Sequence, residues 1–325
     1  MNIRSHITRE VSVMAVICGI DLSSTTMEAR IGASGVEGSF ANTEAGVKLL
    51  AGFCKQHDVT LAVMEATGGY ERMPYRMLWL EGVASAIAHP HAVRCFAQAM
   101  GMLEKTDRLD AGLIAAYAAA RGIVAVPPPS EEQQRLRALV TRLRQLTELQ
   151  VLQKNQKRLV SEAAVLAGFD QILALLKQQM RELEQAIAGL LAADPLWSEL
   201  DRSFREIKGV AKRTVARLMA ELPEIGTLGH KAVAKLVGLA PLAADSGKQR
   251  GPRRVRGGRS TVRSILFVIA CGVKKYQPQY ADFAQRLAQK GKPPKVIRVA
   301  LAHKLLTQLN AKARDTRQRI ASAAA

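Results

Sequence analysis

The sequence is poor in aromatic residues, which make up only 4% of its 325 positions. Proteins that bind single-stranded nucleic acid by stacking bases on rings depend on such side chains, so this class is disfavoured. The chain also has only four cysteines, which are far apart and form no CxxC pair. We therefore expect reduced core cysteines rather than a zinc site or a disulfide framework.

Long apolar runs are missing as well. No stretch approaches the ~18 apolar residues of a membrane-spanning helix, so no membrane partner is expected. The first ten residues are polar and lack the apolar core of a secretion signal. Because Met14 directly precedes the first apolar segment, residues 1–13 are expected to be a flexible tail, or not to be translated at all. These features indicate a cytoplasmic protein.

Acidic residues are scarce in one part of the chain. The net charge is +19 and the pI is about 10.2, which indicates a polyanionic partner. Residues 1–125 carry a net charge of −1 and residues 126–240 a net charge of +4. Residues 241–325 hold 19 Lys or Arg against three acids, a net charge of +16. The first and last parts of the chain therefore have different tasks.

The first part alternates short apolar segments with amphipathic ones, which predicts an α/β domain. Apolar strands are expected at 15–21 and 60–65, and each ends in an acid, Asp21 or Glu65. Further strands are expected at 27–32, 35–41 and 83–88, and helices at 43–57, 70–80 and 107–121.

Four acids of this domain form the candidate metal site. Asp107 and Asp110 are three residues apart and share one face of the last helix, while Asp21 and Glu65 end two strands. Four clustered carboxylates repel one another unless divalent cations lie between them. Mg²⁺ prefers oxygen ligands, and two ions ~3.5–4 Å apart can polarise a phosphodiester. This is the acid layout of RNase H-like nucleases. The alternative is that each acid only caps a helix, fills a turn or faces solvent.

The middle of the chain reads as two long helices. Prolines at 127–129 end the first domain, and Ser130 can cap the next helix. Leucines at 136, 139, 143 and 146 step by 3-4-3, which is typical of a coiled coil. A break is expected at residues 168–170, before a second helix that ends near Pro195. The two helices pair with each other or with another subunit, and oligomerisation is favoured over direct DNA contact.

The last part contains a cationic loop at residues 245–263. After Asp245 it has no acid and seven basic residues, which are Lys248, Arg250, Arg253, Arg254, Arg256, Arg259 and Arg263. So many cations repel one another unless phosphates lie against them, which makes this loop the candidate nucleic-acid-binding site. Its one hydroxyl before the Gly/Pro-rich part, Ser246, is a candidate nucleophile toward a DNA phosphate. A serine needs activation, from Asp245, a metal ion or the surrounding guanidinium groups. The alternative is that Ser246 only fills an Asp-Ser-Gly turn.

Several motifs together resemble the DEDD transposases of the IS110 insertion-sequence family and the related pilin-gene invertases. In the first part they are Gly19-Ile20-Asp21, Met64-Glu65-Ala66-Thr67-Gly68-Gly69-Tyr70 and Lys105-Thr106-Asp107-Arg108-Leu109-Asp110-Ala111. In the last part they are Gly238-Leu239-Ala240-Pro241, Asp245-Ser246-Gly247, Gly257-Gly258-Arg259, and the stretch from Arg286-Leu287 to Lys290-Gly291-Lys292-Pro293. The resemblance covers nearly the whole chain.

The resemblance implies the following organisation: residues 14–126 form a RuvC-like domain, 127–200 a coiled-coil segment and 201–325 a mainly α-helical transposase domain. It implies that Asp21, Glu65, Asp107 and Asp110 bind Mg²⁺, or Mn²⁺ in its place, and that Ser246 forms a covalent phosphoserine link to DNA. The two sites are thought to meet between subunits.

The implied partners are double-stranded DNA at the element ends and the target, a structured guide RNA, and further copies of the chain as a dimer or tetramer. The implied location is the bacterial nucleoid. The chain departs from the family pattern after Asp21, where it has Ser23-Ser24 and later Glu28, none of them an expected metal ligand.

Two other functions remain open on the sequence. One is a RuvC-like Holliday-junction nuclease or DNA invertase in which metal-activated water cuts the strand and Ser246 is structural. The other is an architectural nucleic-acid binder without catalysis.

Overall fold

The computed structural model describes residues 15–32, 34–102, 107–243, 245–247, 251 and 253–324, with the side chains of 107–109 and 324 left out. The expected tail at 1–13 and the predicted nucleic-acid-binding residues Lys248 and Arg250 therefore lie outside the described residues. The chain forms two compact units, Met1–Pro129 and Ser130–Ala325.

The first unit is built on a mixed five-stranded sheet. Its strands are β1 (Ile17–Leu22), β2 (Thr26–Ile31), β3 (Glu37–Ala41), β4 (Leu61–Glu65) and β5 (Ser85–Ala88), in the order β3-β2-β1-β4-β5. The first three strands are an antiparallel meander, whereas β4 and β5 run parallel to β1. The sheet confirms the predicted α/β class, and all five expected strands are present within a few residues of the expected ends.

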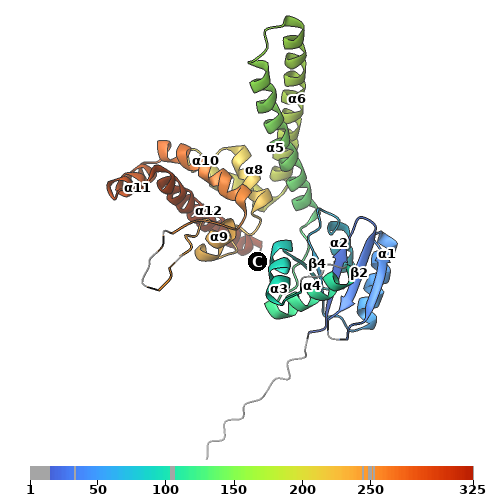
Figure 1. Cartoon of the computed structure of the whole chain (residues 1–325). Helices are drawn as coiled ribbons and strands as arrows, with labels where there is room; N and C mark the ends of the chain where they lie inside the picture. The colour runs from blue at the N-terminus through green and yellow to red at the C-terminus, as the bar shows by residue number, and fades with distance from the viewer. Residues whose placement is uncertain are drawn as a thin grey trace, which may run out of the picture. The chain divides into compact units, whose positions relative to one another are not determined.

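Helices cover both faces of this sheet (Figure 1). Helices α1 (Glu44–Gln56) and α2 (Arg72–Leu80) pack on one face, and α4 (Asp107–Arg121) packs on the other. Thr43 caps the N-terminus of α1, because its hydroxyl accepts a hydrogen bond from the Gly46 amide at 3.2 Å. Helix α3 (Pro90–Ala99), ten residues that begin with a proline, was not among the elements expected from the sequence.

The second unit begins with two paired helices, α5 (Glu131–Lys157) and α6 (Ala163–Ala193) (Figure 1). Ser130 caps α5 as expected, accepting from the Gln133 amide at 3.2 Å. The expected break at 168–170 is wrong, since α6 runs through it. A glycine inside a helix costs only ~1 kcal/mol, and packing against α5 outweighs that. The chain turns at 158–162 instead.

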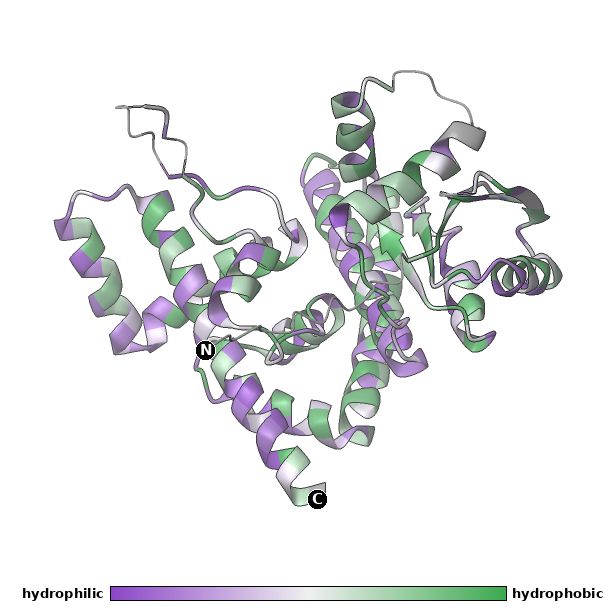
Figure 2. Ribbon diagram, turned by 90° about the horizontal axis from the view of Figure 1, so that it is seen from below, coloured by the Kyte–Doolittle hydropathy of each residue, from purple (hydrophilic) through white to green (hydrophobic). Residues whose placement is uncertain are grey.

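The remaining helices form one core together with the base of the α5–α6 pair. They are α7 (Pro195–Arg205), α8 (Lys212–Glu221), α9 (His230–Val237), α10 (Ser260–Tyr276), α11 (Pro278–Gln289) and α12 (Pro294–Ala324). Hydropathy varies along these helices in stripes of hydrophilic and hydrophobic residues (Figure 2), as expected where one face is buried. Within the described ranges, no helix combines the length and apolar composition needed to cross a bilayer.

The cysteines are divided between core and surface. Cys18 and Cys54 are buried as expected, whereas Cys95 and Cys271 are exposed, which corrects the expectation of four core residues. Both exposed cysteines lie in amphipathic helices, and their position around the helix axis, which three-dimensional packing decides, turns them outward.

Candidate active site

The first set of candidate residues gathers at one edge of the sheet in the first unit. Asp21 is near the end of β1 and Glu65 is the last residue of β4. These strands are parallel neighbours, with Ile20 beside Met64, so the next residues, Asp21 and Glu65, continue side by side. The carboxyl ends of parallel strands form the edge where open α/β sheets place ligands.

Both acids point toward the face that α4 covers. Side chains alternate along a strand. Ile20 and Met64 belong to the core beneath α1 and α2, whereas Ile17 and Val63 belong to the core beneath α4. The odd-numbered positions of both strands therefore face α4, and these positions include Asp21 and Glu65.

Helix α4 approaches this face unusually closely. A Cβ atom on Gly19 would lie only 2.0 Å from the Ala111 carbonyl oxygen and 2.7 Å from the Ala115 nitrogen. Only glycine lets helix and strand meet here, and Asp110 directly precedes the contacting residue Ala111. Asp107 opens α4 as expected, but its side chain is outside the described residues.

The described acids suit a hard cation chemically but do not form a finished metal site. Asp21, Glu65 and Asp110 offer the oxygen ligands that Mg²⁺ prefers. Among the described residues, however, no three His, Cys, Asp or Glu side chains lie close enough together to hold an ion. The four-acid metal site therefore stays a prediction, and Asp107 is the member whose side chain is undescribed.

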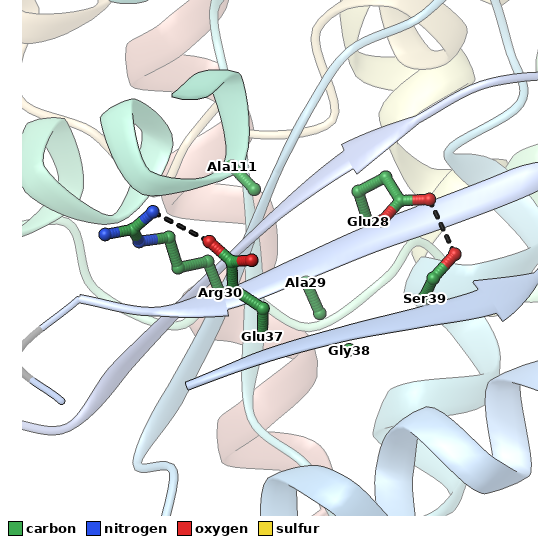
Figure 3. A pocket seen from close by; sticks show the side chains of 7 residues that line it. All are labelled: Glu28, Ala29, Arg30, Glu37, Gly38, Ser39 and Ala111. Atoms are coloured by element: carbon green, nitrogen blue, oxygen red, sulfur yellow. Dashed lines mark hydrogen bonds and ion pairs between the residues drawn. The ribbon is translucent and has the colours of Figure 1, made fainter. Parts of the chain in front are cut away.

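Glu28, which was not an expected metal ligand, is a further acid beside this site. It pairs directly with Asp21 across β1 and β2, so both carboxylates are on the same face. The Ser39 hydroxyl donates to Glu28 Oε1 at 2.6 Å, and both line a hollow of about 180 Å³ that Ala111 also borders (Figure 3). The signal was absent from sequence because strand register, and not spacing along the chain, makes Glu28 a neighbour of Asp21.

The second candidate site is the loop between α9 and α10 in the other unit. Ser246 is exposed, between exposed Asp245 and Gly247. Gly247 has a φ of +54°, a conformation that favours glycine. Asp245 Oδ1 accepts hydrogen bonds from the Arg253 side chain at 2.6 Å and from the Gly251 amide at 3.2 Å. Asp245 thus ties the two sides of the loop together around the serine.

The base of this loop is held closed by backbone contacts. Leu242 and Arg254 exchange backbone hydrogen bonds of 2.9 and 3.3 Å. Next to this pair, a Cβ on Gly258 would lie 2.4 Å from the Gly238 nitrogen, and a Cβ on Gly238 would lie 2.1 Å from the Gly257 carbonyl oxygen. The segment after α9 and the segment before α10 can therefore meet only because both positions are glycine. The loop therefore leaves the unit from a narrow, well-defined base.

Two of the predicted nucleic-acid-binding arginines contact protein groups at this base. Arg259 donates to Glu224 Oε2 at 2.6 Å and to the Glu221 carbonyl at 2.9 Å. Arg263 donates to the Gly257 carbonyl at 2.5 Å and reaches the carbonyls of Val237 and Gly238. Their contact with nucleic acid stays a prediction, as do the contacts of Arg253 and of the exposed Arg254 and Arg256. We name the Arg259–Glu224 pair and the Arg263 contacts the loop clamp.

The loop clamp is expected to weaken in acid. Burial acts to raise the pKa of Glu224, but the hydrogen bonds and charge of Arg259 outweigh it, so its pKa is lowered. A carboxyl with a lowered pKa stabilises the fold above its unfolded value and loses that contribution as pH falls through the folded value. Protection of the Arg259 amide, which donates to the Leu236 carbonyl at 2.9 Å, should therefore fall as the pH drops below the ordinary pKa of a glutamate.

Glu224→Gln removes the ion pair at neutral pH and should reduce that protection. The expected reduction is only several-fold, because both side chains of the pair are partly exposed to solvent. Amide hydrogen exchange with protection factors corrected for pH measures the effect. Asp282→Asn, which neutralises an exposed acid on α11, is the matched control and should change nothing at Arg259. Equal protection in wild type and Glu224→Gln at pH 7 would show that the ion pair does not hold the base of the loop.

Comparison with known proteins covers both units. Residues 18–162 match the family model of DEDD-type IS110 transposases, described as a transposase, and residues 201–285 match that of the transposase IS116/IS110/IS902 family. The chain is similar to the pilin gene-inverting protein of Moraxella bovis, with 27% identity over 308 residues, 89% of this chain and 92% of the relative. The corresponding protein of Moraxella lacunata is 26% identical over the same shares. The first model matches an α/β domain of the RNase H-like kind, and such domains generally use divalent metal ions.

Proposed function

This chain belongs to the IS110 family of transposases and is a DNA recombinase, and from that premise we propose that Ser246 carries the strand-transfer chemistry. The observation that carries the proposal is the position of Ser246. Its hydroxyl is exposed on a loop with a clamped base, in a segment with seven basic residues and no acid after Asp245. A structural turn serine would not require this cationic surrounding.

The proposed reaction exchanges one phosphodiester for another. Serine Oγ forms a bond to a DNA phosphorus, the bond from phosphorus to one DNA oxygen breaks, and the serine proton passes to that leaving oxygen. The DNA is then held as a phosphoserine ester. A hydroxyl of a second DNA end attacks this ester, which restores the serine and joins the strands. No oxidant or energy source is needed, because each step keeps the number of phosphodiester bonds.

The charged groups near Ser246 have different tasks. Asp245 is tied to Arg253 and the Gly251 amide, so we assign it the role of holding the loop. The exposed Arg254 and Arg256 are suited to neutralise the phosphate as its charge increases in the transition state. The arginines of the loop clamp keep the serine loop attached to the ends of α8 and α9.

Asp21, Glu65, Asp107 and Asp110 would hold the divalent cation in the first unit. Mg²⁺ there would supply charge stabilisation at a DNA oxygen. Support comes from the common sheet face of Asp21 and Glu65, the close approach of α4 and the match to a DEDD-type model. The acids and Ser246 belong to separate units, and we assign them complementary parts of one reaction.

The partners follow from charge and surface. The +16 charge of residues 241–325 suits double-stranded DNA, and the guide RNA is carried by family resemblance alone. The α5–α6 pair leaves apolar side chains exposed toward its turn, namely Leu149, Val151, Leu152, Leu159, Val165, Ile172 and Leu175. Such a surface supports coiled-coil pairing with a second copy, as a dimer or tetramer. The working place of such a protein is the bacterial nucleoid.

DNA inversion is the second candidate function, because both relatives named above are called pilin gene-inverting proteins. Inversion and transposition use the same cutting and joining steps and differ in how the DNA ends are arranged. A DNA substrate that carries two element ends on one molecule in inverted orientation distinguishes inversion from transposition by the product that forms.

The experiment that tests the proposal is capture of the covalent intermediate. Element-end DNA with a nick near the cleavage site should trap wild-type protein with Mg²⁺ present, since the released end diffuses away. Protease digestion and mass spectrometry should then locate the DNA remnant on Ser246. Cutting without any trapped adduct would favour hydrolysis by water, and an adduct on another residue would reassign the nucleophile.

A further inference from the structure

One exposed stripe of α10 starts at the clamped base of the serine loop. Its members step by 3-4-3-4 and therefore share one helix face, and all are exposed: Thr261, Ser264, Val268, Cys271 and Lys275. Val268 is 70% exposed, which is unusual for a valine in a long helix. We name this the α10 stripe. Helix α10 contains no acid at all.

A cation from α12, Arg298, lies beside the middle of the stripe. The Arg298 guanidinium is 4.8 Å from the centre of the Phe267 ring, and Phe267 adjoins Val268. Lys295 is one helical turn before Arg298 and lies on the same side of α12. Lys274 and Lys275 end α10. The stripe thus has hydroxyls at the loop end, and cations along its middle and far end.

These cations have few acidic neighbours to balance them. In residues 260–314 the only acid is Asp282. Among the described residues, none of Lys274, Lys275, Lys295 and Arg298 forms an ion pair.

Helix dipoles do not explain the pattern. Lys274 and Lys275 suit the C-terminus of α10, but Lys295 and Arg298 lie near the N-terminus of α12, where the dipole disfavours cations and the first turn has no acid. Such uncompensated charge fits an anionic partner.

We propose that the α10 stripe and its flanking cations bind the phosphate backbone of duplex DNA on one side of the bond that Ser246 attacks. A 17-residue helix is ~25 Å long. At 3.4 Å per base pair this corresponds to about seven base pairs of flanking DNA. Thr261 and Ser264 donate to phosphates nearest the serine loop, Arg298 and Lys275 neutralise phosphates farther along, and Val268 packs against sugars.

Duplex DNA is favoured over RNA because the stripe starts at the loop that holds the proposed nucleophile. The inference rests on the proposed function in that one respect. The stripe has no aromatic residue for stacking single-stranded bases, which suits a double-stranded backbone.

Charge removal tests the contact without using catalysis. Lys275→Gln with Arg298→Gln should lower the affinity for a 30-base-pair duplex at least ~10-fold at 0.1 M salt, and should reduce the slope of log affinity against log salt by about 1.8. The control is Lys154→Gln with Lys177→Gln, which removes the same charge from exposed positions on α5 and α6. Arg298→Lys should restore most of the slope. An equal loss of affinity and slope in the control would show that net charge alone causes the effect, and would overturn the proposal.

The native Cys271 thiol locates the DNA. In a Cys95→Ser protein it is the one exposed cysteine among the described residues. It should cross-link by thiol–disulfide exchange, with release of a small thiol, to duplex DNA that carries a mixed-disulfide tether four to six base pairs from the cleavage site. A tether 15 base pairs away should react far less. Uniform reaction at all positions, or stronger protection of Cys271 by a structured RNA than by duplex DNA, would overturn the assignment.

Ser246→Ala separates this inference from the proposed function. That variant should keep both the salt slope and the Cys271 cross-link while losing the covalent adduct. If the adduct persists in Ser246→Ala, the nucleophile is wrong. If the adduct behaves as expected but the slope and cross-link do not, the α10 stripe is wrong.

Discussion

Ser246→Ala should reduce recombination of element-end DNA by three orders of magnitude or more. Loss of a covalent nucleophile removes the intermediate itself, and losses of this size or larger are typical for such residues. Binding should remain within about twofold, because one exposed hydroxyl contributes little beside many phosphate contacts. The measurement is product formation in a recombination assay, with DNA affinity measured in parallel.

The matched control for this experiment is Ser260→Ala. Ser260 is also an exposed serine in the second unit, at the first position of α10, and it has no assigned role in the reaction. It should recombine at close to the wild-type rate. Normal recombination by Ser246→Ala would refute the phosphoserine mechanism, and an equal loss in both variants would attribute the effect to the loop structure.

Asp21→Asn should abolish metal-dependent cutting, with a loss on the order of 10³-fold, because a carboxylate ligand supplies charge that an amide does not. Glu65→Gln should behave the same way, since Glu65 continues beside Asp21 on the adjacent strand. A readout separate from activity is Mn²⁺ binding followed by electron paramagnetic resonance, which should weaken at least ~10-fold in both variants.

Glu28→Gln is the control that the structure provides for these acids. Glu28 lies directly opposite Asp21 and on the same face, but the Ser39 hydroxyl holds its carboxylate. The Glu28→Gln substitution removes the same charge as Asp21→Asn at nearly the same place. A general electrostatic effect would therefore appear in all three variants. We expect Mn²⁺ affinity in Glu28→Gln to change by less than a few-fold. Unchanged Mn²⁺ binding in Asp21→Asn would remove that acid from the metal site.

Local signals in the sequence accounted for most of the first unit. Apolar runs ending in Asp21 and Glu65 became β1 and β4, because a buried strand needs little beyond its own apolar residues to be recognised. The capping residue Ser130 was read correctly for the same reason, since a cap acts within three residues.

Local signals failed where packing outweighed them. Gly168 looked like a break, yet α6 continues through it because contact with α5 stabilises the helix on both sides. Short α3 went unnoticed since its burial depends on the sheet and α4. The exposure of Cys95 and Cys271 likewise depends on which face of a helix its neighbours cover.

By itself the sequence determined the family and the candidates for the chemistry: the acids at strand ends and the serine in a cationic loop. Only the tertiary structure decided which side chains are neighbours. It brought Glu28 opposite Asp21 through strand register and tied Arg259 and Arg263 to groups far along the chain. It also placed Arg298 of α12 beside an acid-free stripe of α10. The physical reason is that composition and spacing act along the chain, whereas register and helix packing join segments that are distant in sequence.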